Sequence, residues 1–141
     1  MERFEEEVLV RLAHTDPAGF VFYPRYFEMI NALLEDWFAG PLDCDFETLH
    51  GELETGVPTG SIQCEFARPS RLGDRLVFEL VVERIGEGSF TLKIVANDRN
   101  GEQRMKARLV AACLDLETGR ARPILEQIRS WMIDFELCGA G

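Results

Sequence analysis

Apolar and polar residues alternate along the first part of the chain. Between residues 4 and 13 one face carries Phe4, Val8 and Val10, with Glu6 among them, and the other face is mostly charged. A period of two over this length is typical of a strand with one buried face. We therefore expect a first β-strand in this segment.

Between residues 24 and 39 the spacing of apolar residues changes to three and four. The residues that keep this spacing are Tyr26, Phe27, Ile30, Leu33, Leu34, Trp37 and Phe38. They form a wide apolar stripe on a helix, which is about 24 Å long over sixteen residues. Gly40 and Pro41 follow and end such a helix in the usual way. The pattern predicts one long, well-buried helix.

Four more alternating runs follow an acidic, irregular segment at residues 42–58. The runs cover residues 60–67, 75–84, 89–97 and 102–116. Residues 98–101 read Asp-Arg-Asn-Gly, a hairpin turn signal, and residues 123–135 predict a short closing helix. Strands joined by short turns favour an antiparallel sheet, and the long apolar helix needs such a sheet to cover it. The expected fold class is α+β.

The composition fits a folded chain and narrows its partners. With 141 residues, 46% of them hydrophobic, the chain can form one domain with a core, over residues 1–141. The formal net charge of −10 opposes general nucleic-acid binding, which relies on a basic surface. No apolar run approaches the ~20 residues of a membrane span, and the acidic N-terminus does not resemble a secretory signal. These features predict a cytoplasmic protein without nucleic-acid or membrane partners.

The cysteines and histidines offer little support for a metal site. The two histidines, His14 and His50, do not stand in a ligand-like spacing, which argues against zinc. We expect reduced thiols, with the second and third cysteines in the core, because no C-x-x-C occurs among Cys44, Cys64, Cys113 and Cys138.

Candidate chemistry is concentrated just before the long helix. The Pro-Ala-Gly that follows Asp16 bends the backbone into a turn. Pro24 suits the first helical position, but Tyr23 before it is not a capping residue, so first-turn amides are left for water or a ligand. A carboxylate beside free helix amides can attack a carbonyl, or activate water against it, while the amides hold the developing charge. The alternative is that Asp16 only stabilises its own turn.

Taken together, these features resemble the hotdog fold, in which a curved antiparallel sheet of about five strands wraps one long central helix. More narrowly, nearly the whole chain is similar to the aspartate-type branch of the 4-hydroxybenzoyl-CoA thioesterase family. The resemblance is clearest in Asp16-Pro17-Ala18-Gly19, Val21, Tyr23-Pro24 and Tyr26. A second, less specific match is the loop Val57-Pro58-Thr59-Gly60, which leads into residues 61–64.

This resemblance implies an acyl-CoA thioesterase that releases a free acid and CoA. Asp16 would be the catalytic carboxylate, as nucleophile or as general base, and the Tyr23 backbone N–H would polarise the thioester carbonyl. Gly19 would let the loop approach the substrate closely. The other candidates for substrate binding are the matched positions Val21, Tyr26, Pro58, Thr59 and Gly60.

The resemblance also bears on cofactors and assembly. No metal or cofactor is expected, because a thioester is already an activated acyl group and one carboxylate with electrostatic stabilisation can suffice. The family pairs its sheets across a two-fold axis, which implies a homodimer or homotetramer with acyl-CoA as the small-molecule partner.

The sequence departs from the family at the nucleotide of CoA. Benzoyl-specific members carry a basic pair in the turn between the third and fourth strands, whereas residues 84–89 here contain one arginine and an added glutamate. Arg104, Lys106 and Arg108 alternate along the last long strand and share one face, so they are the candidates for binding CoA. The alternative is an ordinary solvated sheet face.

Two other functions stay open at this point. One is a hotdog hydratase or dehydratase, which needs a histidine paired with an acid in its own motif, and the loop Asp16-Pro17-Ala18-Gly19 is not followed by such a histidine or asparagine. The other is a non-catalytic module that binds acyl-CoA or an acyl carrier. A buried carboxylate with no task is costly, which argues against such a module.

Overall fold

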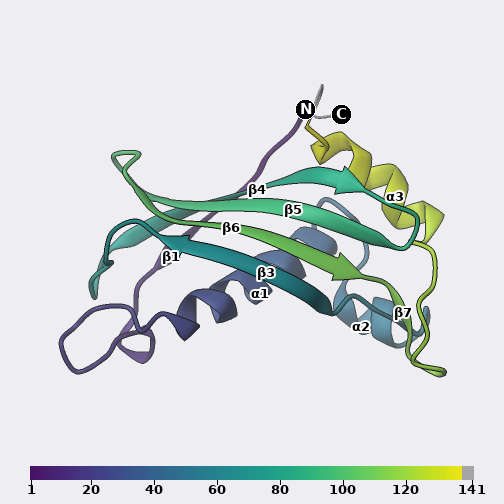
Figure 1. Cartoon of the computed structure of the whole chain (residues 1–141), viewed down its shortest axis with the longest axis horizontal. Helices are drawn as coiled ribbons and strands as arrows, with labels where there is room; N and C mark the ends of the chain where they lie inside the picture. The colour runs from purple at the N-terminus through teal and green to yellow at the C-terminus, as the bar shows by residue number, and fades with distance from the viewer. Residues whose placement is uncertain (138–141) are drawn as a thin grey trace.

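The computed structural model describes residues 1–137 and contains a five-stranded antiparallel sheet (Figure 1). The strand order is β1-β4-β5-β6-β3, so β1 and β3 form the two edges. The strands are β1 (Phe4–Leu9), β3 (Thr59–Phe66), β4 (Arg75–Ile85), β5 (Ser89–Asp98) and β6 (Gln103–Ala112). A separate two-stranded ribbon pairs β2 (Thr55–Gly56) with β7 (Leu114–Asp115).

Helical segments account for most of the remaining structure. They are α1 (Pro24–Ala39), α2 (Phe46–His50), α3 (Glu126–Met132) and the 3₁₀ turns η1 (Leu12–His14) and η2 (Ile133–Phe135). α1 runs along one face of the sheet, with the loop before it and the β5–β6 turn at one end of the molecule (Figure 1). α2 and the ribbon lie at the other end (Figure 1). Among residues 1–137, none of the helices combines the length and apolar character that crossing a bilayer requires.

The core lies between α1 and the inner face of the sheet. Seven side chains of α1 are buried: Tyr26, Met29, Ile30, Leu33, Leu34, Trp37 and Phe38. Every second residue of the two central strands faces them: Leu76, Phe78, Leu80 and Val82 from β4, and Phe90, Leu92, Ile94 and Ala96 from β5. The two periods of the sequence, near four in the helix and two in the strands, therefore meet in a shared core.

The predicted elements agree with the structure in their main features. The helix at residues 24–39 is confirmed with the same bounds, and the strands at 60–67, 75–84 and 89–97 are confirmed to within one residue at either end. The expected sheet of about five antiparallel strands is confirmed as well. The short closing helix expected at residues 123–135 is confirmed as α3 followed by η2. The prediction of one long helix under the sheet is confirmed only in part, because the unpredicted α2 accompanies α1.

Two predicted strand ends and the description of one loop segment differ from the structure. The first strand ends at Leu9, because the chain turns into η1. The run at 102–116 breaks at Cys113, and its last part, β7, pairs with β2. The segment at 42–58, expected to be irregular, contains α2 and β2. Asp45 caps α2, because its carboxylate accepts a hydrogen bond from the Thr48 N–H at 2.8 Å. Elements of two to five residues are too short to show a period, so capping and pairing decide them.

The cysteines differ in burial. Cys113 is buried, as predicted, and Cys44 is buried too. Cys64, expected in the core, is only partly covered, because it stands on the edge strand β3. All three carry free thiols. Cys138, for which a reduced thiol was expected, lies outside the described residues.

One carboxyl group occupies an inward position of β1. Glu6 lies between Phe4 and Val8 on the side that faces α1, and Asp36 of α1 is its neighbour. Burial, then a hydrogen bond with Asp36 and the charge of that residue, raise the pKa of Glu6 from its ordinary 4.5 to about 7. The folded chain therefore holds a proton on Glu6 in a pH range where the unfolded chain has lost it.

This pair predicts a pH-dependent stability. Because the pKa of Glu6 is higher in the folded state, its contribution is complete below pH 4.5 and is lost as the pH rises through about 7. We expect Glu6→Gln to raise the melting temperature at pH 8, where the wild-type carboxylates repel, and to change it little at pH 5. Thermal unfolding at both pH values measures this effect.

Glu5→Gln is the matched control, because Glu5 is exposed on the opposite face of the same strand. It should leave the difference between pH 5 and pH 8 as in the wild type. A Glu6→Gln variant with the wild-type pH dependence would contradict the assignment of this effect to Glu6.

Candidate active site

Asp16 lies in a closed loop between η1 and α1. Its Oδ1 accepts hydrogen bonds from the backbone N–H groups of Ala18, at 2.9 Å, and Phe20, at 3.1 Å. Its own N–H donates to the Phe20 carbonyl at 2.8 Å, and Gly19 closes the turn with a φ of 85°, which favours glycine. In the described part of the chain Oδ2 has no hydrogen-bond partner. Asp16 therefore stabilises its own turn with one oxygen and leaves the other open.

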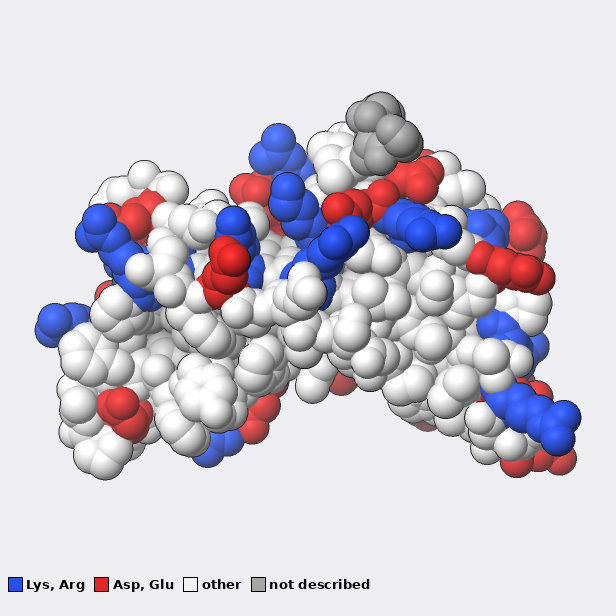
Figure 2. Space-filling model, viewed as in Figure 1, with Lys and Arg blue, Asp and Glu red and all other residues white. Residues whose placement is uncertain are grey.

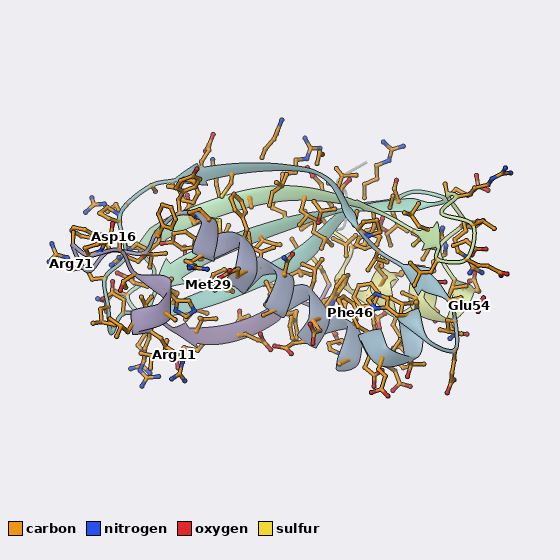
Figure 3. The ribbon with its side chains drawn as sticks, turned by 90° about the horizontal axis from the view of Figure 1, so that it is seen from below. Arg11, Asp16, Met29, Phe46, Glu54 and Arg71 are labelled. Carbon is orange, nitrogen blue, oxygen red and sulfur yellow. The ribbon has the colours of Figure 1, made fainter. Side chains whose placement is uncertain are left out.

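The loop is fastened to a second segment, residues 68–74. Val21 N–H donates to the Ser70 carbonyl at 2.8 Å, and Leu72 N–H donates to the Gly19 carbonyl at 3.0 Å. The guanidinium carbon of Arg71 lies 4.9 Å from the centre of the Phe20 ring, a cation–π contact. Asp16 and Arg71 lie at the same end of the molecule, far from Glu54 (Figure 3). The arginines of this segment are visible in the sequence as a basic group, but nothing in its residues marks it as a neighbour of Asp16.

The start of α1 supplies one open backbone amide. No side chain caps the helix at Tyr23, as predicted. Two of the nearby amides are nevertheless used, because Arg25 N–H donates to the Phe22 carbonyl at 2.8 Å and Tyr26 N–H to the Tyr23 carbonyl at 3.1 Å. Pro24 has no N–H, and within residues 1–137 the Tyr23 N–H donates no hydrogen bond. The predicted set of free amides is thus reduced to that of Tyr23, at the positive end of the helix dipole.

Exposed aromatic rings surround the helix start. Phe22, Tyr23 and Phe66 keep 49%, 57% and 44% of their surface exposed. Phe22 and Tyr23 have ring centroids 5.6 Å apart, and Phe66, at the end of β3, lies 6.1 Å from Tyr23. Such rings give an apolar group or an aryl ring a surface to pack on. Phe66 was not predicted as a site residue, although its exposed position at a strand end is visible once the fold is known.

The predicted substrate-binding residues fall into separate groups. Gly19 and Val21 belong to the Asp16 loop, and Val21 also packs against the core. Tyr26 is 4% exposed, and its hydroxyl donates to Ser70 Oγ at 2.8 Å. Burial raises the pKa of Tyr26 above its ordinary value, so the phenol keeps its proton and donates. Tyr26 is therefore turned inward.

The loop at residues 58–60 lies far from Asp16 along the same chain. Pro58, Thr59 and Gly60 are exposed at the start of β3, whereas Phe66 at its end is the part that reaches Tyr23. Seven steps along a strand span roughly 20 Å. A single copy of the chain does not bring this loop to the Asp16 carboxylate.

The predicted CoA-binding residues share one face of β6, as expected, and all of them have carboxylate partners. Lys106 pairs with Glu65 at 3.2 Å and Arg108 with Glu83 at 2.7 Å. Arg104 lies within 3.2 Å of two carboxylates, and its side chain is only 14% exposed. In Figure 2 blue and red side chains lie next to one another along the upper part of the molecule, whereas most of the middle is white. The prediction that these residues bind CoA stays untested.

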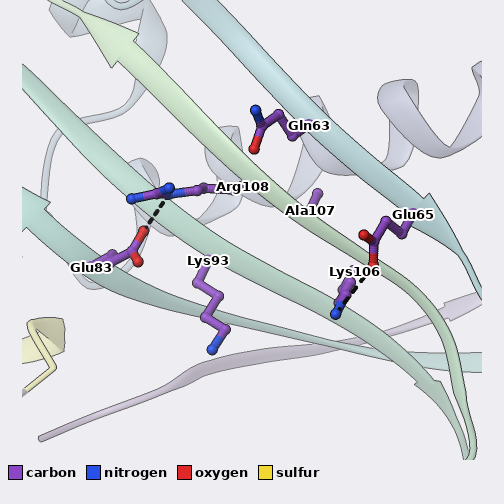
Figure 4. A pocket seen from close by; sticks show the side chains of 7 residues that line it. All are labelled: Gln63, Glu65, Glu83, Lys93, Lys106, Ala107 and Arg108. Atoms are coloured by element: carbon purple, nitrogen blue, oxygen red, sulfur yellow. Dashed lines mark hydrogen bonds and ion pairs between the residues drawn. The ribbon is translucent and has the colours of Figure 1, made fainter. Parts of the chain in front are cut away.

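A shallow pocket lies on this outer face of the sheet (Figure 4). Its volume is about 210 Å³, and Lys106, Arg108 and Lys93 line it together with the two glutamates that pair with Lys106 and Arg108. Lys93 comes from β5, between the other strands, and was missed in the sequence because its neighbours on the face are far away along the chain. Cross-strand register, which a sequence does not contain, brings these three cations together.

Comparison with known proteins relates this arrangement to a family. A family model described as the thioesterase-like superfamily matches residues 10–132. A curated relative, the 1,4-dihydroxy-2-naphthoyl-CoA hydrolase of Acaryochloris marina, is 25% identical over 125 residues, which cover 87% of this chain and 90% of that protein.

Solved structures show the same fold. A 1,4-dihydroxy-2-naphthoyl-CoA thioesterase from Synechocystis superposes with a TM-score of 0.86 at 20% identity, covering 94% of this chain and 97% of the other. A Staphylococcus aureus protein in complex with CoA gives 0.87 at 11% identity, covering 95% and 84%. These likenesses confirm the expected hotdog thioesterase fold.

The family match includes the Asp16 loop, the whole of α1 and four of the five strands of the main sheet. The resemblance found in the sequence is thus confirmed for the superfamily, although not for the narrower 4-hydroxybenzoyl-CoA branch. The chain belongs to the thioesterase-like superfamily.

Proposed function

We propose that this protein hydrolyses an acyl-CoA thioester to a free acid and CoA, as one catalytic domain over residues 1–141. One observation carries the proposal: two groups without hydrogen-bond partners in residues 1–137 lie at the same end of the molecule. They are Oδ2 of the Asp16 carboxylate and the backbone N–H of Tyr23 at the start of α1. The family and the names of the relatives, which are aryl-CoA hydrolases, support it.

In this mechanism the Tyr23 N–H donates to the thioester carbonyl oxygen. Negative charge grows on that oxygen when the carbonyl is attacked, and the amide together with the helix dipole stabilises it. Asp16 Oδ2 acts in one of two ways. As general base it takes a proton from water, whose oxygen attacks the carbonyl carbon, and the departing CoA thiolate then receives the proton. As nucleophile it attacks the carbon itself and the C–S bond breaks, which releases the CoA thiolate. Water then hydrolyses the resulting anhydride to the free acid and the Asp16 carboxylate, and the proton released goes to the thiolate.

The edge strand β3 supports a dimer. Most of its residues are exposed, and it ends the sheet without a neighbour on one side in the described chain. Long exposed edges are normally covered. If two copies pair antiparallel along β3 about a two-fold axis, residues 58–60 of one copy come to the Phe66 end of the other, beside its Asp16 loop. In such a dimer, residues 58–60 and the Asp16 loop belong to one site although they lie far apart within each copy.

The outer basic residues are our candidates for the phosphates of CoA. Lys106 and Arg108 keep 52% and 60% of their side chains exposed, and Lys93 lies between them and β4 in the pocket of Figure 4. Their ion pairs with Glu65 and Glu83 lie at the surface, where such pairs contribute little to stability. A phosphate can therefore displace the two glutamates. We keep the 4-hydroxybenzoyl-CoA branch as the narrower family assignment within this proposal.

The first prediction concerns the carboxylate. Asp16→Asn keeps the Oδ1 acceptor and the turn but removes the charge, so we expect kcat to fall by about 10²–10⁴, the usual size for a lost acid–base group. Thiol release from acyl-CoA, followed with a thiol-reactive dye, measures kcat, and the melting temperature checks the fold.

Asp45→Asn is the matched control, since Asp45 also accepts a backbone N–H but caps α2. It should hydrolyse at the wild-type rate. A folded Asp16→Asn variant with most of its activity would remove Asp16 from the mechanism, and wild-type binding of acyl-CoA without thiol release would favour a binding module.

The aromatic surroundings predict the range of acyl groups. We expect benzoyl, 4-hydroxybenzoyl and hexanoyl thioesters to be hydrolysed with kcat/KM values within about 10–200-fold of one another, because apolar pockets discriminate weakly. Malonyl-CoA should be the poorest of the four, since its carboxylate would lie among apolar rings. Malonyl-CoA as the best substrate would mean that a basic residue lines the acyl pocket, contrary to this description.

The exposed edge strand β3 predicts that the protein forms at least a dimer. Light scattering at micromolar concentration should give at least twice the 16.0 kDa mass of one chain. A mass of a single chain under conditions where the enzyme is fully active would contradict both the dimer and the shared site.

A further inference from the structure

We infer that Arg104 is a positioning residue, which acts through Ser70 and Tyr26 to hold the Asp16 loop against the start of α1. This inference rests on the proposed function for its catalytic consequence, although its structural part does not. On this inference Arg104 does not bind CoA but supports the loop that carries Asp16.

The guanidinium of Arg104 is occupied by groups of its own chain, and its side chain is only 14% exposed. Nη1 donates to the Pro69 carbonyl at 2.8 Å and to Asp74 Oδ2 at 3.2 Å, and Nη2 donates to Asp98 Oδ2 at 3.2 Å. The Glu102 carboxylate lies 3.4 Å from Nε. One arginine of β6 is thereby joined to the β5–β6 turn and to the segment at residues 68–74.

Charge keeps this arrangement together. Burial works against the guanidinium charge, but Asp98, Asp74 and Glu102 outweigh it and raise the pKa of Arg104 above its ordinary value. Without the arginine these three carboxylates would repel one another. A phosphate of CoA would have to displace them, whereas the exposed Lys106 and Arg108 need give up only one partner each.

Ser70 is the point where three parts of the chain meet. It is 1% exposed, and its Oγ accepts from Tyr26 Oη at 2.8 Å and lies 3.4 Å from Arg104 Nη1. Its carbonyl accepts from Val21 N–H at 2.8 Å. The hydroxyl thus contacts α1 and β6, while the carbonyl of the same residue contacts the Asp16 loop.

These contacts bear on both proposed catalytic groups. Tyr26 lies in the first turn of α1, three residues after Tyr23, and Val21 follows Phe20, whose N–H holds Asp16 Oδ1. The position of the carboxylate relative to the Tyr23 N–H therefore depends on Ser70, which Arg104 holds from the sheet. A displacement of about 1 Å at such a site costs on the order of 10²-fold in rate.

Two single changes test the linkage without removing the charge cluster. Tyr26→Phe deletes one hydroxyl and keeps the ring against Phe66, and Ser70→Ala deletes its acceptor. We expect each to lower kcat about tenfold, with KM within twofold of the wild type. The double variant should be no worse than Ser70→Ala alone, because Ser70→Ala already removes the hydrogen bond that Tyr26→Phe breaks. A raised KM with unchanged kcat would mean that Tyr26 touches the substrate and would overturn the positioning role.

Arg104 itself is tested with two substitutions. Arg104→Ala should lower kcat by about 10–100-fold, and Arg104→Lys, which keeps the charge, should recover part of that loss. If Arg104→Ala does not fold, the Tyr26 and Ser70 variants still decide the question. Arg99→Ala is the control and should leave both constants unchanged, because within residues 1–137 this exposed arginine pairs only with Glu7 on β1.

A second readout separates this inference from the proposed function. Amide hydrogen exchange at Ala18, Phe20 and Val21 should be at least tenfold faster in Tyr26→Phe and Ser70→Ala than in the wild type, and unchanged in Arg99→Ala. Faster exchange without thioesterase activity in the wild type would refute the proposed function and leave the structural linkage in place. Unchanged exchange and unchanged kcat in all variants would refute the linkage.

Discussion

The packing of α1 against the inner face of the sheet fixes the rest of the structure. Each fully buried side chain of the helix is worth about 1.5–3 kcal/mol, and residues such as Trp37 and Phe38 have no exposed surface at all. Because the helix direction is set by this contact, its first residue must lie at one end of the sheet, next to the last residue of β3. The loop from β1 then has to cross that same end, and it does so at Asp16.

This constraint explains why the proposed site is built on backbone groups. The crossing loop is short and cannot form a core of its own, so its amides bond within the loop and to residues 68–74. One oxygen of Asp16 serves the turn and the other is left open. The Tyr23 N–H stays open because Tyr26, at the third helical position, has no side-chain acceptor that reaches back to it, as Glu or Gln does in a capping box. The same local features that shape the loop thereby leave two groups for a substrate.

Charged side chains are distributed differently on the two sides of the sheet. Carboxylates greatly outnumber cations in the chain as a whole, but the outer face of β5 and β6 gathers lysine and arginine, while Glu6 and Asp36 face each other near α1. Under the proposed function, the phosphates of the substrate would bind to these cations, although the protein as a whole is acidic. Neighbouring cations on this strand face differ in their surroundings: the Arg104 side chain is 14% exposed among three carboxylates, whereas Lys106 and Arg108 are 52% and 60% exposed with one partner each.

The sequence by itself determined the elements with a readable period and the residues with special backbone chemistry. The helix at residues 24–39, the alternating strands, the turn at Asp16 and the uncapped helix start were all visible, because each depends on neighbours within a few residues. Only the tertiary structure decided what lies next to what. Ser70 beneath the loop, Phe66 beside Tyr23, Lys93 between Lys106 and β4, and the pairing of β2 with β7 all join residues far apart along the chain. Their contacts come from strand register and from the burial of α1, which no local pattern encodes.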